Sequence, residues 1–72
     1  MNRDILEGKW KQLRGEVKRQ WGELTDDDLD VVNGNLDVLI GMLQERYGYS
    51  REQAESEVDR FVRESESYSN RF

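Results

Sequence analysis

The 72-residue sequence contains no cysteine, no histidine and no proline. A chain without cysteine has no disulfide, and without cysteine and histidine it lacks the usual protein ligands of zinc and haem. Without histidine it also cannot form a Ser–His–Asp catalytic triad. The absence of proline suits a chain that is helical along most of its length. We therefore expect a non-enzymatic helical protein with no metal and no cofactor.

Long apolar runs are absent as well. The longest uncharged apolar stretch, VLIGML, is far shorter than the roughly 20 residues needed to cross a bilayer, and the N-terminus lacks the apolar run of a signal peptide. Because 35% of the residues are hydrophobic and 38% are charged, we expect a small core. The sequence predicts one cytoplasmic domain over residues 1–66, followed by a frayed polar tail at 67–72.

Basic residues gather near the N-terminus. Residues 1–22 hold six Lys or Arg against three Asp or Glu, a balance of +3, whereas residues 23–72 hold five against thirteen, a balance of −8. Together they give the net charge of −5. The basic segment can contact an anion, but the acidic remainder repels nucleic acid and anionic membranes. A solvated helix face is the simpler interpretation of the same cations.

The spacing of apolar residues predicts two long helices. The first is expected over residues 3–21, ending at Gly22, because apolar residues recur there at helical spacing: Leu6, Trp10, Leu13, Val17 and Trp21. The second is expected over residues 35–47, between Gly34 and Gly48. It should be the central helix because apolar residues cover much of its circumference: Leu36, Val38, Leu39, Ile40, Met42, Leu43 and Tyr47.

A helix start signal follows each long helix. In LTDDDL, Thr25 is the expected cap and Asp28 its capping-box partner, while Leu24 and Leu29 form a hydrophobic staple. The three aspartates of this segment also suit the positive end of the helix dipole. We expect this short helix to end near Asn33.

The second start signal lies in YSREQA. Ser50 is the expected cap and Gln53 its return partner, with Tyr49 and Ala54 as the staple. The last helix is expected to continue to about residue 65 through three apolar residues: Val58, Phe61 and Val62.

A shift of 26 residues aligns the two halves of the sequence. It places glycine on glycine at three positions: Gly8 on Gly34, Gly15 on Gly41 and Gly22 on Gly48. Each half is then a long helix with a glycine stop, followed by a capped second helix. The sequence therefore predicts an all-α, four-helix domain in which two helical hairpins pack crosswise.

The glycines inside the long helices need a reason, since each costs about 1 kcal/mol relative to alanine. At about 100° per residue, Gly8 and Gly15 lie opposite the apolar stripe of the first helix. They reflect tolerated flexibility, or a neighbouring segment packed close, or a bare backbone stripe that a partner approaches. In the last case we expect a contact surface of five residues: Gly8, Lys11, Gly15, Lys18 and Arg19.

The segments GKWKQLRGEVKRQWGELTDDDL and GNLDVLIGMLQERYGYSREQAESEV resemble the CsbD-like family of small bacterial stress-response proteins. The resemblance covers about residues 2–62. It implies a bundle of two crossed hairpins like that of SAM-type domains, and abundance in the cytoplasm under general stress. It supplies no catalytic residue, and the acidic tail after about Arg63 departs from the family pattern.

The sequence favours a protein that acts by contact with another protein or with itself. Nucleic-acid binding is an alternative in which Trp10 and Trp21 stack on bases, provided that the core does not bury them. An unspecific stress protectant is a third. The run DDDLD is not an EF-hand calcium loop, because Val31 and Asp37 occupy the positions where such a loop needs Gly and Glu.

Overall fold

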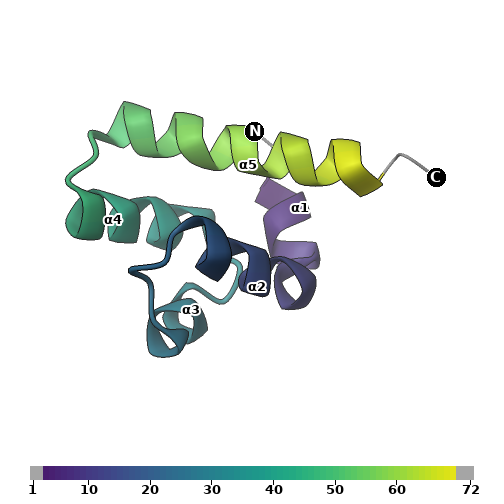
Figure 1. Ribbon diagram of the computed structural model, residues 1–72, viewed down its shortest axis with the longest axis horizontal. Helices are drawn as coiled ribbons and strands as arrows, with labels where there is room; N and C mark the ends of the chain where they lie inside the picture. Colours follow the sequence, from purple (N-terminus) through teal and green to yellow (C-terminus); the bar gives the residue numbers. More distant parts are fainter. Residues whose placement is uncertain (1–2, 70–72) are drawn as a thin grey trace.

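The computed structural model describes the backbone of residues 3–69 and the side chains of residues 6–65. Within this part of the chain every regular element is a helix (Figure 1). The helices are α1 (Arg3–Gly8), α2 (Trp10–Gln20), α3 (Asp26–Val32), α4 (Leu36–Tyr47) and α5 (Arg51–Ser69). The prediction of an all-helical fold is confirmed.

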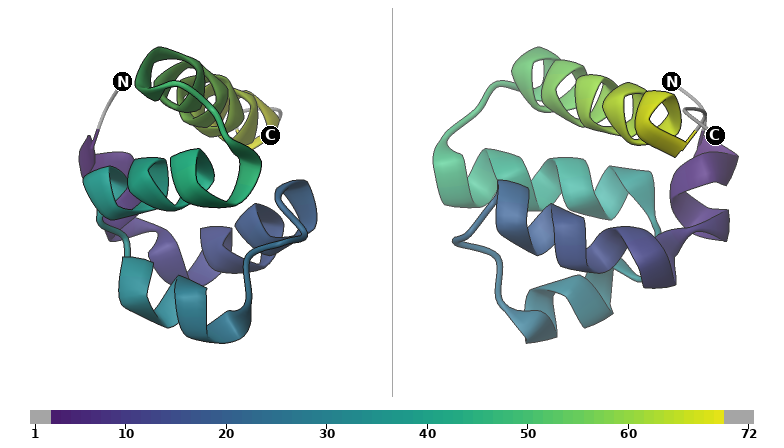
Figure 2. Two further views of the ribbon diagram at one scale, coloured as in Figure 1. Left: turned by 90° about the vertical axis from the view of Figure 1, so that its left-hand side faces the viewer. Right: turned by 45° about the vertical axis from the view of Figure 1, so that its right-hand side comes forward.

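Helix α4 lies in the middle of the fold. It packs against α5, α3 and α1, whereas α2 packs against α1 and α3. Figure 2 shows α5 as one outer layer, α4 beneath it and α3 on the far side. In Figure 1, α5 extends beyond the end of α4 and passes over α1. A helix that is apolar around much of its circumference thus has neighbours on several sides.

One hydrophobic core joins the five helices. From α4 it takes Leu36, Leu39, Ile40 and Leu43. The other helices and the α2–α3 loop contribute a single stripe or fewer residues each: Leu6, Trp10, Leu13, Val17, Trp21, Leu24, Leu29, Val32, Ala54, Val58 and Val62. Because isolated helices of this length are marginal in water, this shared burial is what stabilises them.

The prediction of a single helix over residues 3–21 is wrong. The chain forms two helices that meet at Lys9, whose φ is −113° and ψ 18°. The described part of the chain therefore has five helices, not the four that the sequence predicts. Leu6 and Trp10 are four residues apart and both buried, so their spacing fits a continuous helix equally well.

The break coincides with a close approach of the α3–α4 turn. A Cβ on Gly34 would lie 3.0 Å from the Cα of Glu7 and 3.3 Å from the Cβ of Trp10. The turn thus packs into the junction of α1 and α2, where Gly8 adds backbone freedom. Gly34 is therefore more than a helix stop: its lack of a side chain permits a tertiary contact.

The ends of α3 and α4 follow the glycine and asparagine signals. Asn33 caps α3 in the left-handed conformation, with φ 42°, and donates its N–H to the Leu29 carbonyl. Gly48 caps α4 with φ 70° and donates its N–H to the carbonyl of Gln44. Both ends lie within a residue or two of their predicted places.

Helix α5 is longer than predicted, since it continues to Ser69 instead of ending near residue 65. Ion pairs spaced three or four residues apart support its second half: Arg60 with Glu57, and Arg63 with Asp59. Of the predicted polar tail, residues 67–69 belong to α5 and residues 70–72 lie outside the described part.

Candidate contact surface

Helix α2 has an apolar face toward the core and a basic face toward solvent. Its buried residues are Trp10, Leu13 and Val17. The opposite face carries four of the five residues predicted to form a contact surface: Lys11, Gly15, Lys18 and Arg19. All four are exposed, and we call them the α2 surface.

Gly15 leaves the backbone of α2 uncovered. A Cβ at this position would meet no atom within 4 Å, and the same holds for Gly8 and for Gly41 on α4. No neighbouring segment of the described chain therefore packs closely against these glycines. Gly8 is the last residue of α1, so the break at Lys9 places it on a different helix from Gly15, and the two do not form one continuous stripe.

One edge of the α2 surface is tied to α3 by ion pairs. The Nζ of Lys18 lies 2.7 Å from Oδ1 of Asp26, and beside it Nη1 of Arg14 lies 2.9 Å from Oδ1 of Asp30. The hydrogen bond and the charge of Lys18 hold the pKa of Asp26 below its ordinary value. Two cations of α2 are thus already paired with carboxylates of this chain.

Three exposed cations on α2 or directly before it form no ion pair with the described side chains: Lys9, Lys11 and Arg19. Two of them, Lys9 and Lys11, stand at the start of α2, where no acidic residue accompanies them and the helix dipole disfavours positive charge. The stability of α2 therefore does not explain them.

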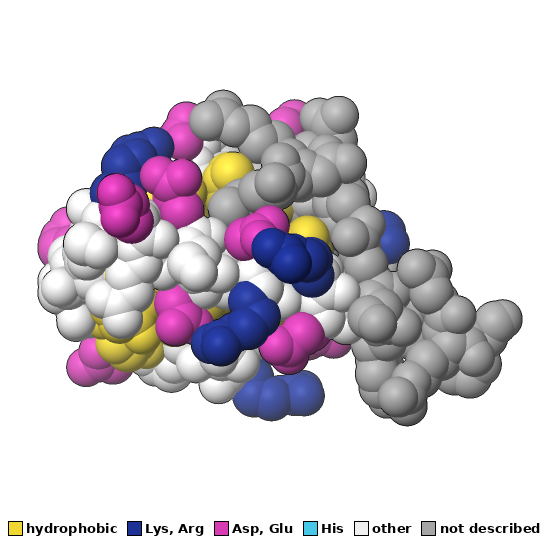
Figure 3. Space-filling model, turned by 90° about the horizontal axis from the view of Figure 1, so that it is seen from above, with side chains coloured by type: hydrophobic (Ala, Val, Ile, Leu, Met, Phe, Trp, Pro, Cys, Tyr) yellow, Lys and Arg dark blue, Asp and Glu magenta, His cyan; other side chains and the backbone are white. Residues whose placement is uncertain are grey.

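The face over α5 differs from the α2 surface. Figure 3 shows Lys and Arg side chains next to Asp and Glu side chains on this face. Arg51 pairs with Glu55, and Arg60 with Glu57, within the helix itself. Such exposed pairs place charges of both signs side by side, unlike the α2 surface, where the exposed charges are basic.

Both indoles lie in the core. Trp10 is 6% exposed and Trp21 is 2% exposed, and the ring of Trp21 lies 5.2 Å from that of Phe61. Stacking on a nucleic-acid base requires an open ring face, which neither indole has. The nucleic-acid alternative thus keeps its cations but has no tryptophan platform.

Thr25 and Asp28 form a capping box at the start of α3. The hydroxyl of Thr25 accepts the N–H of Asp28 at 3.1 Å, and Oδ2 of Asp28 accepts the N–H of Thr25 at 3.0 Å. The other carboxylate oxygen accepts a hydrogen bond from Nη2 of Arg46 at 2.8 Å. The hydrogen bond from the Thr25 backbone, with those from its side chain and from Arg46, lowers the pKa of Asp28. Asp28 therefore joins the start of α3 to the end of α4.

The remaining caps are local. The hydroxyl of Ser50 accepts the N–H of Gln53 at 3.1 Å at the start of α5. The cap of α4 is Asn35, which is not among the predicted caps, and its Oδ1 accepts the N–H of Val38 at 3.3 Å. An asparagine directly before an apolar helix is a signal that could have identified it.

Tyr47 and Phe61, both predicted in the core, are half-buried at its edge. The hydroxyl of Tyr47 accepts the N–H of Glu23 at 3.1 Å, which ties the end of α4 to the α2–α3 loop. Its ring stacks on that of Tyr49 at a centroid distance of 5.5 Å. These aromatic contacts cover the side of the core next to the end of α4 and the α2–α3 loop.

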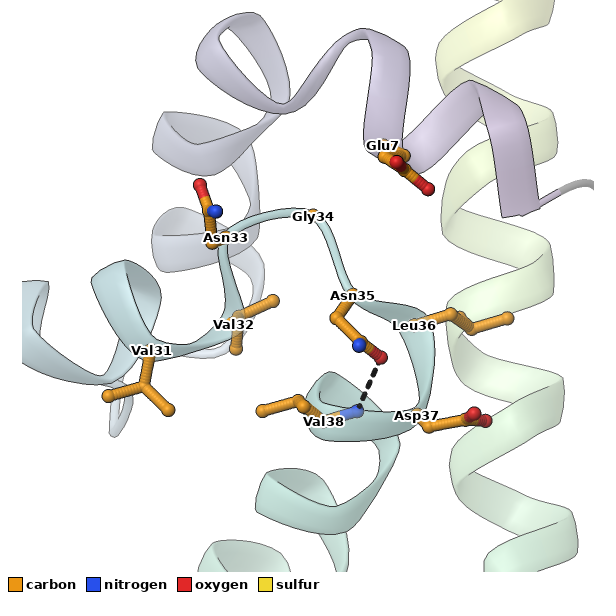
Figure 4. Close-up of a pocket in the computed structure, with 9 residues that line it drawn as sticks. All are labelled: Glu7, Val31, Val32, Asn33, Gly34, Asn35, Leu36, Asp37 and Val38. Carbon is orange, nitrogen blue, oxygen red and sulfur yellow. Dashed lines mark hydrogen bonds between the residues drawn. The ribbon is translucent and has the colours of Figure 1, made fainter.

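Two open hollows flank the α1–α2 junction. One, of about 350 Å³, lies along the α3–α4 turn and is lined by Val31, Asn33 and Asp37 among others (Figure 4). The other, of about 630 Å³, lies at the start of α2 beside Gly8 and Lys11.

The described side chains include no cluster of three or more Asp, Glu, His or Cys suited to a metal ion. None of the helices in that same part is long and apolar enough to cross a membrane.

The fold and the α2 surface define a class of protein: a small helical domain with a basic surface on one helix. Comparison with known proteins identifies the family. The family model described as CsbD-like matches residues 4–56. The UPF0337 protein YjbJ of Escherichia coli K12 is 57% identical over 58 residues, which cover 81% of this chain and 84% of YjbJ. A UPF0337 protein of Pseudomonas aeruginosa is 57% identical over 61 residues, covering 85% of this chain and 94% of that protein. The chain belongs to the CsbD-like family, as the resemblance predicts.

Proposed function

We propose that this protein is a non-enzymatic, cytoplasmic stress-response protein that binds an acidic surface of another protein through the α2 surface. The stress assignment rests on the family resemblance. The binding assignment rests on one observation: exposed cations that form no ion pair with the described side chains surround a helix backbone that Gly15 leaves bare.

The physical argument has two parts. A helix without a side chain at Gly15 lets the backbone of a partner approach more closely than any other residue would allow. The cations Lys9, Lys11 and Arg19 attract carboxylates, speed the encounter and favour an acidic partner over a basic one. The alanine that would stabilise α2 at position 15 would also cover this backbone.

A second copy of the chain fits this surface less well. Two antiparallel α2 helices that cross at Gly15 would bring Lys11 of one copy near Arg19 of the other. These two positive charges would repel each other. Nucleic acid would use the same cations, but the net charge of −5 opposes it. An unspecific protectant has no need of a packed core with both indoles inside it.

A pull-down from stressed bacterial cells tests the proposal, with nuclease-treated lysate and the tagged full-length chain. The test variant carries Lys11→Gln and Arg19→Gln. The control variant carries Gln53→Glu and Ser56→Glu on the exposed side of α5, so that both variants lower the net charge by the same amount. We expect an acidic protein to bind the parent chain and the control, to be lost with the test variant and to dissociate at high salt.

Two results would count against this function. Equal capture by parent and test variant would show that the partner binds elsewhere. Binding of the parent chain to single- or double-stranded DNA at low ionic strength, lost in the test variant, would assign the same cations to nucleic acid. A Gly15→Leu variant tests the bare backbone separately, since it keeps every charge and only covers the helix.

We also propose that residues 1–66 form one domain of two crossed hairpins, related to the SAM-type arrangement. The contacts of α2 with α3 and of α4 with α5 support two hairpins, and the contact of α3 with α4 supports their crossing. Superposition of residues 10–32 on residues 36–58 in an experimental structure tests this. Clearly different angles between the two helices of each half would contradict it.

A further inference from the structure

The Asn33–Gly34 peptide forms the turn between α3 and α4. Asn33 has φ 42° and ψ 42°, and Gly34 has φ 82°. The side chain of Asn33 is exposed and makes no hydrogen bond with the described residues, whereas Asn35 binds the N–H of Val38 (Figure 4). Two asparagines two positions apart therefore differ in whether their carboxamides are engaged.

We propose that Asn33 is a site of spontaneous deamidation whose rate is controlled by the opening of this turn. The backbone nitrogen of Gly34, after losing its proton, attacks Cγ of Asn33 and forms a C–N bond. The bond from Cγ to Nδ2 breaks, and ammonia leaves with that proton. Water then opens the cyclic imide at either carbonyl and yields aspartate or isoaspartate. Glycine favours the attack because it has no side chain to obstruct it.

The closed turn prevents this attack. With ψ of Asn33 at 42°, the nitrogen of Gly34 points away from the Cβ of Asn33, and ring closure requires the two to lie on the same side of the Cα–C bond. The peptide plane must therefore rotate before the reaction begins. Deamidation is a reaction of the opened turn.

Three contacts hold the turn closed. The N–H of Asn33 binds the carbonyl of Leu29 at 3.0 Å, and the N–H of Asn35 binds the carbonyl of Val32 at 2.7 Å. Gly34 also packs into the junction of α1 and α2, so the turn cannot rotate without separating from that junction. The rate at Asn33 consequently reports how often this part of the fold opens.

The product does not fit the closed turn. Isoaspartate adds a methylene group to the main chain beside Gly34, where a single added Cβ would already lie 3.0 Å from the Cα of Glu7. It also places a new carboxylate in the left-handed position. A molecule that has opened and deamidated therefore keeps a weakened contact between the turn and α1. The change is one-way, so it accumulates with time spent under conditions that open the turn.

The full-length chain is incubated at mildly alkaline pH, in buffer and in urea, and deamidation is located by fragment-ion mass spectrometry. We expect isoaspartate and aspartate at position 33 in both, with a rate at least about tenfold higher in urea, which corresponds to an opening free energy of at least about 1.4 kcal/mol. Asn35 is the internal control and should stay unmodified in buffer. The side chain of Leu36 hinders attack, and the carboxamide of Asn35 accepts the N–H of Val38. Asn33→Gln should abolish the product at this position and keep the fold.

Several outcomes would overturn the proposal. Equal rates in buffer and urea would show that the turn exerts no control. Modification in urea but none in buffer, over a period in which the unfolded chain reacts completely, would show that the folded protein does not expose the site. A purified isoaspartate form with the same thermal midpoint as the parent would show that the product fits the turn.

Discussion

Asp28 links two helix ends through one carboxylate, with the α3 cap on one oxygen and Arg46 of α4 on the other. Because these contacts lower the pKa of Asp28 in the folded protein, the native state binds fewer protons than the unfolded chain as the pH falls. The contribution of Asp28 to stability is full above the unfolded value of about 3.9 and disappears as the pH falls through the lower native value.

The corresponding prediction concerns acid unfolding. Asp28→Asn, which cannot ionise, should lose less stability than the parent chain when urea unfolding is compared between neutral pH and about pH 2. Asp26 and Asp59 have lowered pKa values as well, so the variant should retain part of the acid sensitivity. Identical pH profiles for parent and variant would remove Asp28 from the account of acid stability.

Thr25 provides a second prediction at this scale. Thr25→Ala removes the hydroxyl that accepts the N–H of Asp28, and should lower the free energy of unfolding by about 1 kcal/mol and the thermal midpoint by about 4–8 °C. Thr25→Ser keeps the hydroxyl and serves as the matched control. Circular dichroism melts of both variants decide it, and a Ser variant that melts as low as the Ala variant would contradict a role for the cap.

These two residues also show what local sequence can reveal. Thr25 and Asp28 stand three positions apart, so their mutual hydrogen bonds follow from the geometry of one helix start. Arg46 is 18 residues further along the chain, and its bond to Asp28 exists only because α4 packs on α3. No spacing rule reports a contact of that kind.

At the scale of elements, glycines with different surroundings should respond to alanine in opposite directions. Gly15 lies in helical backbone with open space around it, so Gly15→Ala should raise the free energy of unfolding by about 0.5–1 kcal/mol, as should Gly41→Ala. Gly34 has positive φ and backbone within 3.0 Å, so Gly34→Ala should lower it by more than about 1 kcal/mol. Urea unfolding of the three variants is the measurement. A destabilised Gly15→Ala would show that α2 is packed differently from this structure.

The start and stop signals of α3 and α4 predict their bounds, because Thr25, Asn33, Gly34 and Gly48 act on the backbone next to them. The break at Lys9 could not be predicted in this way. It depends on the docking of the α3–α4 turn, and the apolar residues on either side keep the spacing of an unbroken helix. The same docking gives Gly34 its second role. In the sequence Gly34 can be recognised only as a helix stop, because its contact with the α1–α2 junction exists only in the folded chain.

Burial supports the internal repeat at the level of single positions. A shift of 26 residues carries Trp10, Leu13 and Val17 of α2 onto Leu36, Leu39 and Leu43 of α4, and all six are buried. It also carries exposed Gly15 onto exposed Gly41. Their surroundings differ, however, because basic residues flank Gly15 whereas Val38 and Met42 flank Gly41. A contact surface on α2 therefore need not be repeated on α4.

For the whole molecule, the sequence predicts the cations of the candidate surface but not which of them remain available. Arg14 and Lys18 are drawn to α3 by Asp30 and Asp26, and only the folded arrangement separates them from Lys11 and Arg19. Charge counting along the chain treats all these cations alike. The distinction matters for experiments, since neutralising Lys18 would disturb the α2–α3 contact as well as any partner.

The single core predicts cooperative unfolding of the entire chain. Trp10 stands at the α1–α2 junction and Trp21 beside Phe61, yet both belong to one buried cluster. Native tryptophan emission should therefore be blue-shifted and resistant to iodide. In the single-tryptophan variants Trp10→Phe and Trp21→Phe, fluorescence and circular dichroism should give the same urea midpoint within each variant. If the fluorescence of Trp10 changed at lower urea than the helix signal, the α1–α2 junction would unfold as a separate unit. That result would also point to the opening that exposes the neighbouring turn, because Gly34 packs beside Trp10 at this junction.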